Sequence, residues 1–150
     1  MSNIILKSTA LAAGEAVTGS MKSLLDDGVL NIYAGPPPAH PNDALAGNTL
    51  LCQLTLGGDG VTGLVFDAAA TNGVLKKPPA AVWSGTNAAS GTGSFWRWNS
   101  NAGDDNSAVA GSNYRLQGTV GTDASESMFL STTTFVAGAT TALDTFQIIL

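Results

Sequence analysis

The segment FWRW at residues 95–98 combines three aromatic side chains with an arginine, a set of residues that can bind planar ligands. On an exposed strand, Trp96 and Trp98 would point to the same side and form a platform for sugar rings or bases, with Arg97 beside it. On a buried strand, the same rings would fill the core of a β-sandwich, because each removes a large apolar area from water. The chain has only ten aromatic residues, so the pattern favours a core role. We expect one side of this strand to fill the core and the other to meet a neighbouring subunit.

A run of acidic and amide residues follows at 103–107, with the sequence GDDNS. Its carboxylate and amide oxygens are ligands that Ca²⁺ accepts. The segment lacks the alternating acidic positions and the distal glutamate of a calcium-binding loop. Asp, Asn, Gly and Ser are also the residues of hairpin turns, so we predict a turn and no metal site.

The histidine and the cysteine of the chain each occur once. His40 lies in the segment PPPAHPND, and no G-x-S-x-G motif supplies a nucleophile for it, so we expect an exposed loop histidine. Cys52 alternates in phase with Leu50, Leu54 and Leu56, which predicts a buried core residue rather than an intersubunit disulfide. A single cysteine excludes an internal disulfide and a four-cysteine zinc site. We expect no enzymatic activity and no cofactor.

The composition is poor in charge. Hydrophobic residues make up 44% of the 150 residues and charged residues 11%, against roughly 25% in an ordinary soluble domain. The net charge is −5 and the six basic residues are scattered, which argues against a nucleic-acid partner. No window approaches the ~20 apolar residues of a membrane span. Lys7 follows the first apolar residues and Glu15 comes soon after, so we expect synthesis in a host cytoplasm without a signal peptide.

One segment, residues 11–27, has the periodicity of an amphipathic α-helix. The residues that recur on its apolar face are Val17, Met21, Leu24 and Leu25. Gly28 follows directly, at the position where a left-handed residue usually ends a helix.

The rest of the chain has the period of two that is typical of strands. Eight or nine short strands are predicted, with glycine-rich turns between them. They lie at residues 3–7, 29–33, 48–58, 63–69, around Trp83, 92–100, 113–121, 126–138 (one or two strands) and 143–150. The prolines after Gly35 exclude residues 36–47 from a central sheet and predict an extended surface loop. We therefore expect a mainly β protein, an antiparallel β-sandwich of jelly-roll or immunoglobulin type, with one N-terminal helix. Residues 1–10 would form an arm and residues 11–150 a single domain.

Several stretches together resemble small virion proteins of tailed bacteriophages. In "LLDDGVLNIYAGPPPAHPNDALAGNTLLCQLTLG" (residues 24–57), a helix with an acidic-Gly end leads into an Ile-Tyr-x-Gly strand, a proline-rich loop and a Leu-Leu strand. The segments "GSFWRWNSNAG", "YRLQGTVGT" and "TTTFVAGATTALDTFQIIL" resemble the second half of such proteins. The resemblance covers about residues 10–150.

This resemblance implies a head decoration, or cement, protein built as a β-sandwich without catalytic residues. It would bind the major capsid protein on the outside of the shell as a homo-oligomer, a dimer or trimer. A tail or baseplate protein and a carbohydrate-binding module that uses Trp83, Trp96 and Trp98 are the alternatives. Low charge, extended segments and prolines suit docking against neighbours. The expected interface residues are Ile4, Ile5, Leu6, Pro36, Pro37, Pro38, His40, Pro41, Trp96 and Trp98.

Overall fold

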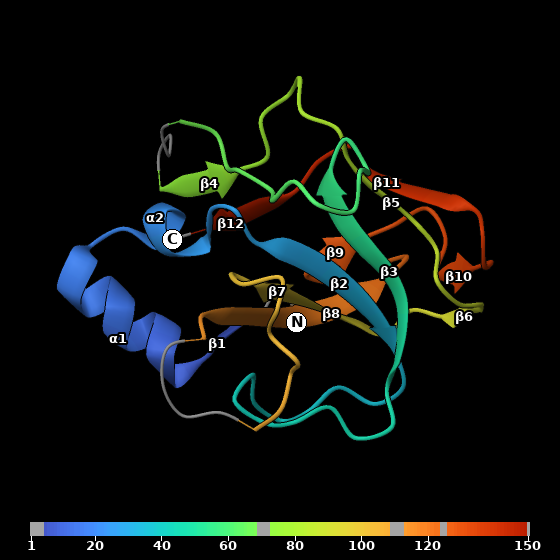
Figure 1. Ribbon diagram of the computed structural model, residues 1–150, viewed down its shortest axis with the longest axis horizontal. Coiled ribbons are helices and arrows are strands. Elements are labelled where there is room, and N and C mark those ends of the chain that lie inside the picture. The colour runs from blue at the N-terminus through green and yellow to red at the C-terminus, as the bar shows by residue number, and fades with distance from the viewer. Residues whose placement is uncertain (1–4, 69–72, 109–112, 124–125, 150) are drawn as a thin grey trace.

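The computed structural model describes residues 5–68, 73–108, 113–123 and 126–149. Its two helices are α1 (Thr9–Thr18) and α2 (Met21–Leu25), which lie together at one end of the molecule (Figure 1). The strands are β1 (Leu6–Lys7), β2 (Val29–Ala34), β3 (Thr49–Leu56), β4 (Val74–Lys76), β5 (Trp83–Thr86), β6 (Gly91–Thr92), β7 (Phe95–Asn99), β8 (Arg115–Gly121), β9 (Met128–Phe129), β10 (Thr134–Phe135), β11 (Thr140–Leu143) and β12 (Gln147–Ile149).

One large sheet dominates the molecule. Its strand order is β1-β8-β7-β2-β3-β5-β11, all neighbours in it are antiparallel, and β9 adds to β8 in parallel. Two small antiparallel pairs, β10-β6 and β12-β4, complete the strands of the described residues. The predicted mainly β, antiparallel fold is confirmed.

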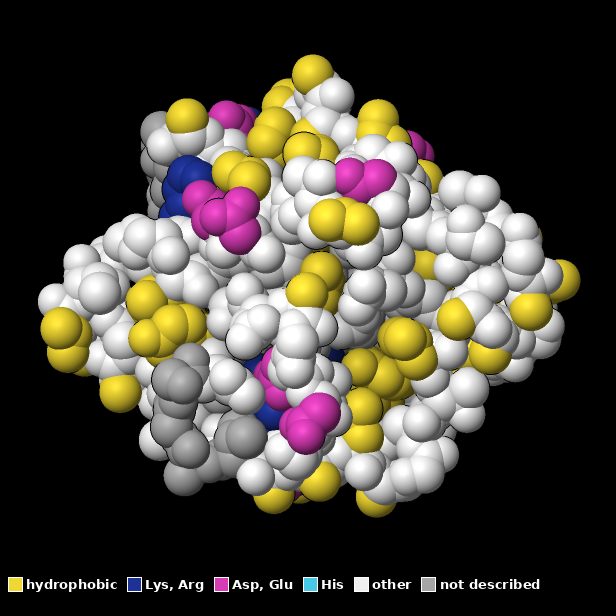
Figure 2. Space-filling view, viewed as in Figure 1, with side chains coloured by type: hydrophobic (Ala, Val, Ile, Leu, Met, Phe, Trp, Pro, Cys, Tyr) yellow, Lys and Arg dark blue, Asp and Glu magenta, His cyan; other side chains and the backbone are white. Residues whose placement is uncertain are grey.

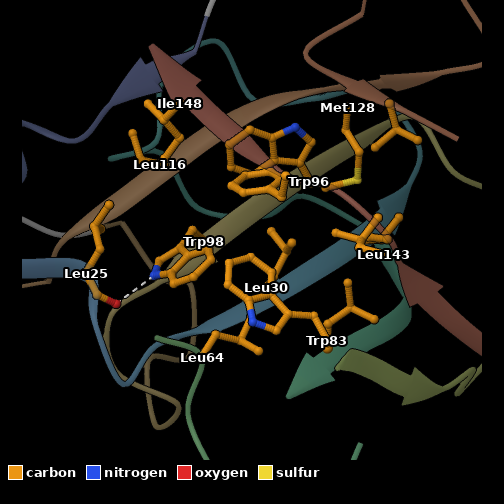
Figure 3. Packing of buried hydrophobic residues seen from close by; sticks show 14 of the residues in the cluster. Leu25, Leu30, Leu64, Trp83, Trp96, Trp98, Leu116, Met128, Leu143 and Ile148 are labelled. Carbon is orange, nitrogen blue, oxygen red and sulfur yellow. Dashed lines mark hydrogen bonds between the residues drawn. The ribbon is translucent and has the colours of Figure 1, made fainter. Parts of the chain in front are cut away.

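The core lies between the large sheet and the β12-β4 pair, which is the layered arrangement of a β-sandwich. Alternation along β7 turns Trp96 and Trp98 toward this core, opposite Ile32 and Leu30 of β2. Figure 3 shows Ile148 of β12 on the other side of these rings. The rings of Phe66, Trp83, Trp98 and Phe146 contact one another at centroid distances of 4.7–6.4 Å.

A bulge changes the pattern of β3. Ile32 lies opposite Cys52 and Tyr33 opposite Leu50, so Leu51 has no partner of its own on β2. As a result Leu51 is buried in the core cluster together with Cys52, although strict alternation places the two side chains on opposite faces. The prediction of a buried Cys52 is confirmed.

The single helix predicted over residues 11–27 is wrong, because the segment forms two helices. Gly19 adopts a left-handed conformation (φ 67°) that ends α1, and the side chain of Ser20 then accepts a hydrogen bond from the Ser23 N–H at the start of α2. Met21 is buried as expected, whereas Val17 lies before the break and is 87% exposed.

The left-handed residue after α2 is Asp27 (φ 66°), not the expected Gly28. A glycine is needed at position 28 for a different reason: a Cβ atom added there would lie 2.4 Å from Nε1 of Trp98 and clash with it. The indole N–H of Trp98 donates to the carbonyl of Leu25 at 3.0 Å, so the end of α2 is held directly on the core (Figure 3).

The predicted N-terminal arm is also wrong for the part of it that the structure describes. Leu6 and Lys7 pair with Gln117 and Leu116 of β8, and Ser8 is buried and caps α1. These residues are therefore part of the domain. Of the expected interface residues, Ile4 lies outside the described residues.

The strand predicted at 63–69 is absent in its described part, where Leu64 forms only an isolated bridge with Gly28. The described part of the chain has no helix with the length and apolar character needed to cross a bilayer.

Candidate functional site

The three tryptophans are all inside the molecule. Trp83, Trp96 and Trp98 each have 0% exposure, which contradicts the carbohydrate platform and the proposed interface role of Trp96 and Trp98. The physical reason is the opposing layer of strands, which covers this face of β7. The core interpretation of FWRW is confirmed.

The opposite face of the same strands is polar yet also buried. Gln53, Asn31, Arg97 and Gln117 lie side by side in register across β3, β2, β7 and β8. Gln53 Nε2 donates to Asn31 Oδ1 at 3.0 Å, and Arg97 donates twice to Gln117 Oε1, from Nε at 3.1 Å and Nη2 at 2.6 Å. Sequence reasoning placed a neighbouring subunit on this face. The chain covers it instead with its own loops.

Residues 35–48, which we call the proline loop, form the main part of this cover. Three side chains of the polar face donate to its carbonyls: Gln117 Nε2 to Pro38 at 2.7 Å, Arg115 Nη1 to Pro41 at 3.0 Å and Arg97 Nη1 to Asp43 at 3.2 Å. Prolines leave the loop without some backbone donors, but their carbonyl oxygens remain strong acceptors.

The ends of the proline loop are held as well. Asn48 Nδ2 donates to the carbonyls of Ala34 and Pro36 at 3.2 and 3.0 Å. On the other side, Asn42 exchanges two hydrogen bonds with Thr9 at the start of α1, at 2.7 and 3.0 Å. The loop is thus tied to the sheet and to α1, and we expect it to keep one conformation.

His40 stabilises the conformation of the proline loop through two hydrogen bonds. Its Nδ1 accepts from the Asn42 N–H at 3.1 Å, while its own N–H donates to Asp43 Oδ2 at 3.0 Å. The side chain is half-buried rather than fully exposed as predicted.

The turn lies slightly earlier than the predicted segment GDDNS, where the Asp104 N–H donates to the Asn101 carbonyl at 3.0 Å, and Asp104 itself contributes a buried charge. The Asp104 carboxylate accepts from Arg115 Nε at 2.6 Å and Nη2 at 2.5 Å, with side-chain exposures of 1% and 0%. Asn99 Nδ2 and the Asn106 N–H donate to it at 2.8 and 2.9 Å. Burial alone would raise the pKa of Asp104, but these hydrogen bonds hold it below its ordinary value.

Asn106 connects Arg97 and Asn99 to the hydroxyl of Tyr33 on the polar face. It has a left-handed backbone (φ 59°), and its Oδ1 accepts from Arg97 Nη1 at 3.3 Å and Asn99 Nδ2 at 2.9 Å. Its Nδ2 donates to the Tyr33 hydroxyl at 3.1 Å.

Burial governs the electrostatics of this layer. Burial raises the pKa of Tyr33 to about 12. Burial, followed by the positive charge of Arg115, lowers the pKa of Arg97 to about 10. In the described part of the chain, the hydrogen bonds of Arg97 go to neutral groups, whereas Arg115 has the Asp104 carboxylate. The layer is held together mainly by amides and carbonyls.

The polar layer can hold a loop in place. Its side-chain donors already form hydrogen bonds within the chain. Among the described residues, no group of three or more His, Cys, Asp or Glu side chains is placed to bind a metal ion. Cys52 is buried, and burial raises the pKa of its thiol to about 11, which keeps it in the unreactive thiol form.

The expected interface residues therefore separate into three groups. Pro36 and Pro37 are exposed at the beginning of the proline loop. Ile5, Leu6, Pro38 and His40 are half-buried. Pro41, like Trp96 and Trp98, is buried, so its proposed interface role is wrong: it lies against the sheet where Arg115 binds its carbonyl.

The exposed part of the proline loop is small and almost uncharged. It consists of Gly35, Pro36, Pro37, Ala39, Asp43, Ala44, Ala46 and Gly47. On the face drawn in Figure 2, charged side chains form only small isolated groups among uncharged and hydrophobic ones. No family model, curated protein or solved structure matches the chain.

Proposed function

We propose that the chain is a structural protein of a tailed-bacteriophage virion, a head decoration protein that binds the major capsid protein through the proline loop. The sequence resemblance to small virion proteins supports this role. The observation that carries it is the attachment of the proline loop to the buried polar layer. Three side-chain donors on β7 and β8 hold the carbonyls of Pro38, Pro41 and Asp43.

A loop fixed in this way is suited to docking. A flexible loop must be ordered when it binds, at a cost of about 0.5–1.5 kcal/mol for each immobilised side chain, whereas a preordered loop avoids most of this cost. The exposed residues, among them Pro36, Pro37 and Ala39, carry few charges that must be desolvated on contact. Such a surface fits protein–protein contact better than a reaction in water.

Oligomerisation would raise the overall affinity of a weak contact for the shell. We propose that the protein binds the shell as a homo-oligomer, because several linked copies of a weak site can raise the overall affinity by about 10²–10⁴ without a new contact. Because the exposed part of the loop is small, we expect a single copy to bind weakly and the oligomer to bind tightly.

Binding to heads assembled from the major capsid protein of the same genome tests the proposal. Ala39→Arg places a long charged side chain on the exposed loop, and Ala88→Arg, at an exposed alanine between β5 and β6, is the matched control. We expect Ala39→Arg to weaken co-sedimentation with heads by about tenfold or more, or ~1.4 kcal/mol, and Ala88→Arg to bind like the parent protein.

Two outcomes would overturn this assignment. If Ala39→Arg bound heads as tightly as Ala88→Arg and the parent protein, the proline loop would be excluded as the contact. Failure of the parent protein to bind heads, with immunogold label on the tail or baseplate of complete virions, would move the protein to the tail.

A further inference from the structure

The strand β11 ends the large sheet, and among the described residues it pairs only with β5. Its other side, which we call the free edge, is open, since Thr140 and Ala142 on this strand are exposed. Natural proteins protect such edges with charged residues, proline, a bulge or a short strand. The strand at the other end of the sheet, β1, carries Lys7. β11, with the sequence TTAL, has only its short length as protection, so its edge is available to another strand.

The hydrogen bonds at the start of β11 show which backbone groups point to the free edge. The Asn87 N–H donates to the Ala139 carbonyl at 2.7 Å, which directs that carbonyl toward the β5 side. In an antiparallel ladder, the backbone groups of successive residues point alternately to the two sides. Thr141 therefore has the same phase as Ala139 and faces β5. The N–H and C=O groups of Thr140 and Ala142 face the free edge.

This end of the molecule carries no charge. Residues 78–96 and 127–143, which include β5, β6, β10 and β11, contain no Asp, Glu, Lys, Arg or His. These four strands lie together on the right in Figure 1, and no charged side chain is drawn at the right-hand end of Figure 2. Two copies with a net charge of −5 each repel one another least where neither carries a charge. A strongly charged partner finds no opposite charge here.

A second copy of the chain presents the matching edge. Antiparallel pairing about a twofold axis is self-complementary, because each copy offers the same donors and acceptors to the other. With the axis at Thr141, Thr140 of one copy lies opposite Ala142 of the other, and each such pair exchanges both of its backbone hydrogen bonds. Val136, shortly before β11, is 59% exposed and adds apolar surface beside the paired strands.

We propose that the free edge of β11 is a self-association site, at which β11 of a second copy adds in antiparallel orientation. The two large sheets then continue into one another across the twofold axis, held by the backbone groups of Thr140 and Ala142. This inference names the contact of the homo-oligomer and rests on that part of the proposed function. It does not depend on binding to a phage head.

Hydrogen exchange of single amides in the purified protein, without heads, tests the pairing. The contact is small, so we expect a dimer at about 100 µM and mainly monomer at about 1 µM. The amides of Thr140 and Ala142 should exchange about tenfold more slowly at the higher concentration, because they gain acceptors only in the dimer. The amide of Thr141 faces β5 in both states and is the internal control. Fragmentation mass spectrometry resolves these amides at both concentrations.

Substitutions at the edge give a second test. Thr140→Arg brings two like charges together near the axis, and Ala142→Pro removes an N–H of the pairing at an edge position where proline is tolerated. Ala88→Arg is the control, because this exposed alanine donates its N–H to the carbonyl of Leu51 on β3, away from the free edge. Sedimentation equilibrium should show a dimer dissociation constant raised about tenfold or more by both edge variants and unchanged by the control.

Three results would overturn the proposal. The first is a parent protein that stays monomeric at about 100 µM. The second is a dimer that Thr140→Arg and Ala88→Arg form equally well, with tryptophan fluorescence like that of the parent. The third is a dimer in which the amides of Thr140 and Ala142 exchange at a rate independent of concentration. The first result would also remove the homo-oligomer from the proposed function, whereas the other two would move its contact to another surface. Binding of heads by the proline loop is measured separately, by co-sedimentation.

Discussion

Replacing Asp104 by alanine removes the carboxylate that forms the ion pair with Arg115 in the buried polar layer. The loss comprises two hydrogen bonds from the guanidinium, at 2.6 and 2.5 Å, and one each from Asn99 and the Asn106 N–H. The Arg115 guanidinium stays in the buried layer, because its Nη1 remains bound to the carbonyls of Pro41 and Ser107.

The size of the effect follows from this burial. Breaking a buried ion pair by removing one partner costs about 3–5 kcal/mol, a large part of the roughly 5–15 kcal/mol that stabilises an ordinary domain. With a urea slope of about 2 kcal/mol per M, the midpoint of unfolding should fall by about 2 M. We expect the proline loop to loosen as well, since Arg115 holds the carbonyl of Pro41.

Asp105→Ala is the matched control. Asp105 is exposed, and its carboxylate accepts a hydrogen bond from the Ser107 N–H at 2.9 Å. Its loss should leave the midpoint of unfolding close to that of the parent protein, because solvent screens an exposed carboxylate. Urea unfolding monitored by tryptophan fluorescence measures both variants, and hydrogen exchange of residues 39–48 reports on the loop. If the midpoints of the two variants agreed within about 0.3 M, the assignment of Asp104 as a stabilising buried partner would be refuted.

Two further predictions concern acid stability and the aromatic core. Because the folded-state pKa of Asp104 lies below its unfolded value, its contribution to stability is present above about pH 4 and is lost as the pH falls through the folded pKa. The free energy of unfolding should thus fall less steeply between about pH 5 and 2 in Asp104→Asn than in the parent protein; parallel curves would contradict the assignment. Trp98→Ala should cost about 3–5 kcal/mol, and Trp98→Phe clearly less, because phenylalanine keeps a ring and loses mainly the hydrogen bond to Leu25. Sugar titration should not change the tryptophan fluorescence of the parent protein, and a saturable change would revive the glycan-binding alternative.

Local alternation made much of the core predictable. On a strand, neighbouring side chains point to opposite faces, so the separation of Trp96 and Trp98 from Phe95 and Arg97 follows from the sequence. The phase of Cys52 with Leu54 predicted its burial in the same way. Alternation did not predict the burial of Leu51, because a bulge adds one residue to β3 there. The sequence of one strand does not show where its pairing with the next strand is interrupted.

The helical segment shows a second kind of failure. Apolar spacing connected Val17 to Met21 and Leu25 across one helix face. Apolar spacing carries no information about backbone conformation. Gly19 adopts a left-handed conformation, which ends the first helix and changes the direction of the chain. A stop signal inside an apolar pattern, Gly followed by the N-cap Ser20, was the available clue.

The polar layer could not be found from pattern alone. Arg97, Gln117 and Asn31 are each ordinary polar residues in alternation, and that pattern usually indicates a solvent-exposed face. Their burial depends on the proline loop and on Asp104, which reach them from other parts of the chain. No local signal links the Arg115 guanidinium to the Pro41 carbonyl, which lies 74 positions away in the sequence.

By itself, the sequence determined the antiparallel β class, the two faces of the central strands and the rigid, non-pairing character of residues 36–47. These properties follow from side-chain alternation and from the φ restriction of proline, which act within a few residues. Only the tertiary structure decided that the polar face is covered by the chain's own loop, that Asp104 is the partner of Arg115 and that both helices lie at one end of the sheet. These features depend on contacts between distant segments, which form only where the fold brings donors and acceptors within about 3 Å of each other.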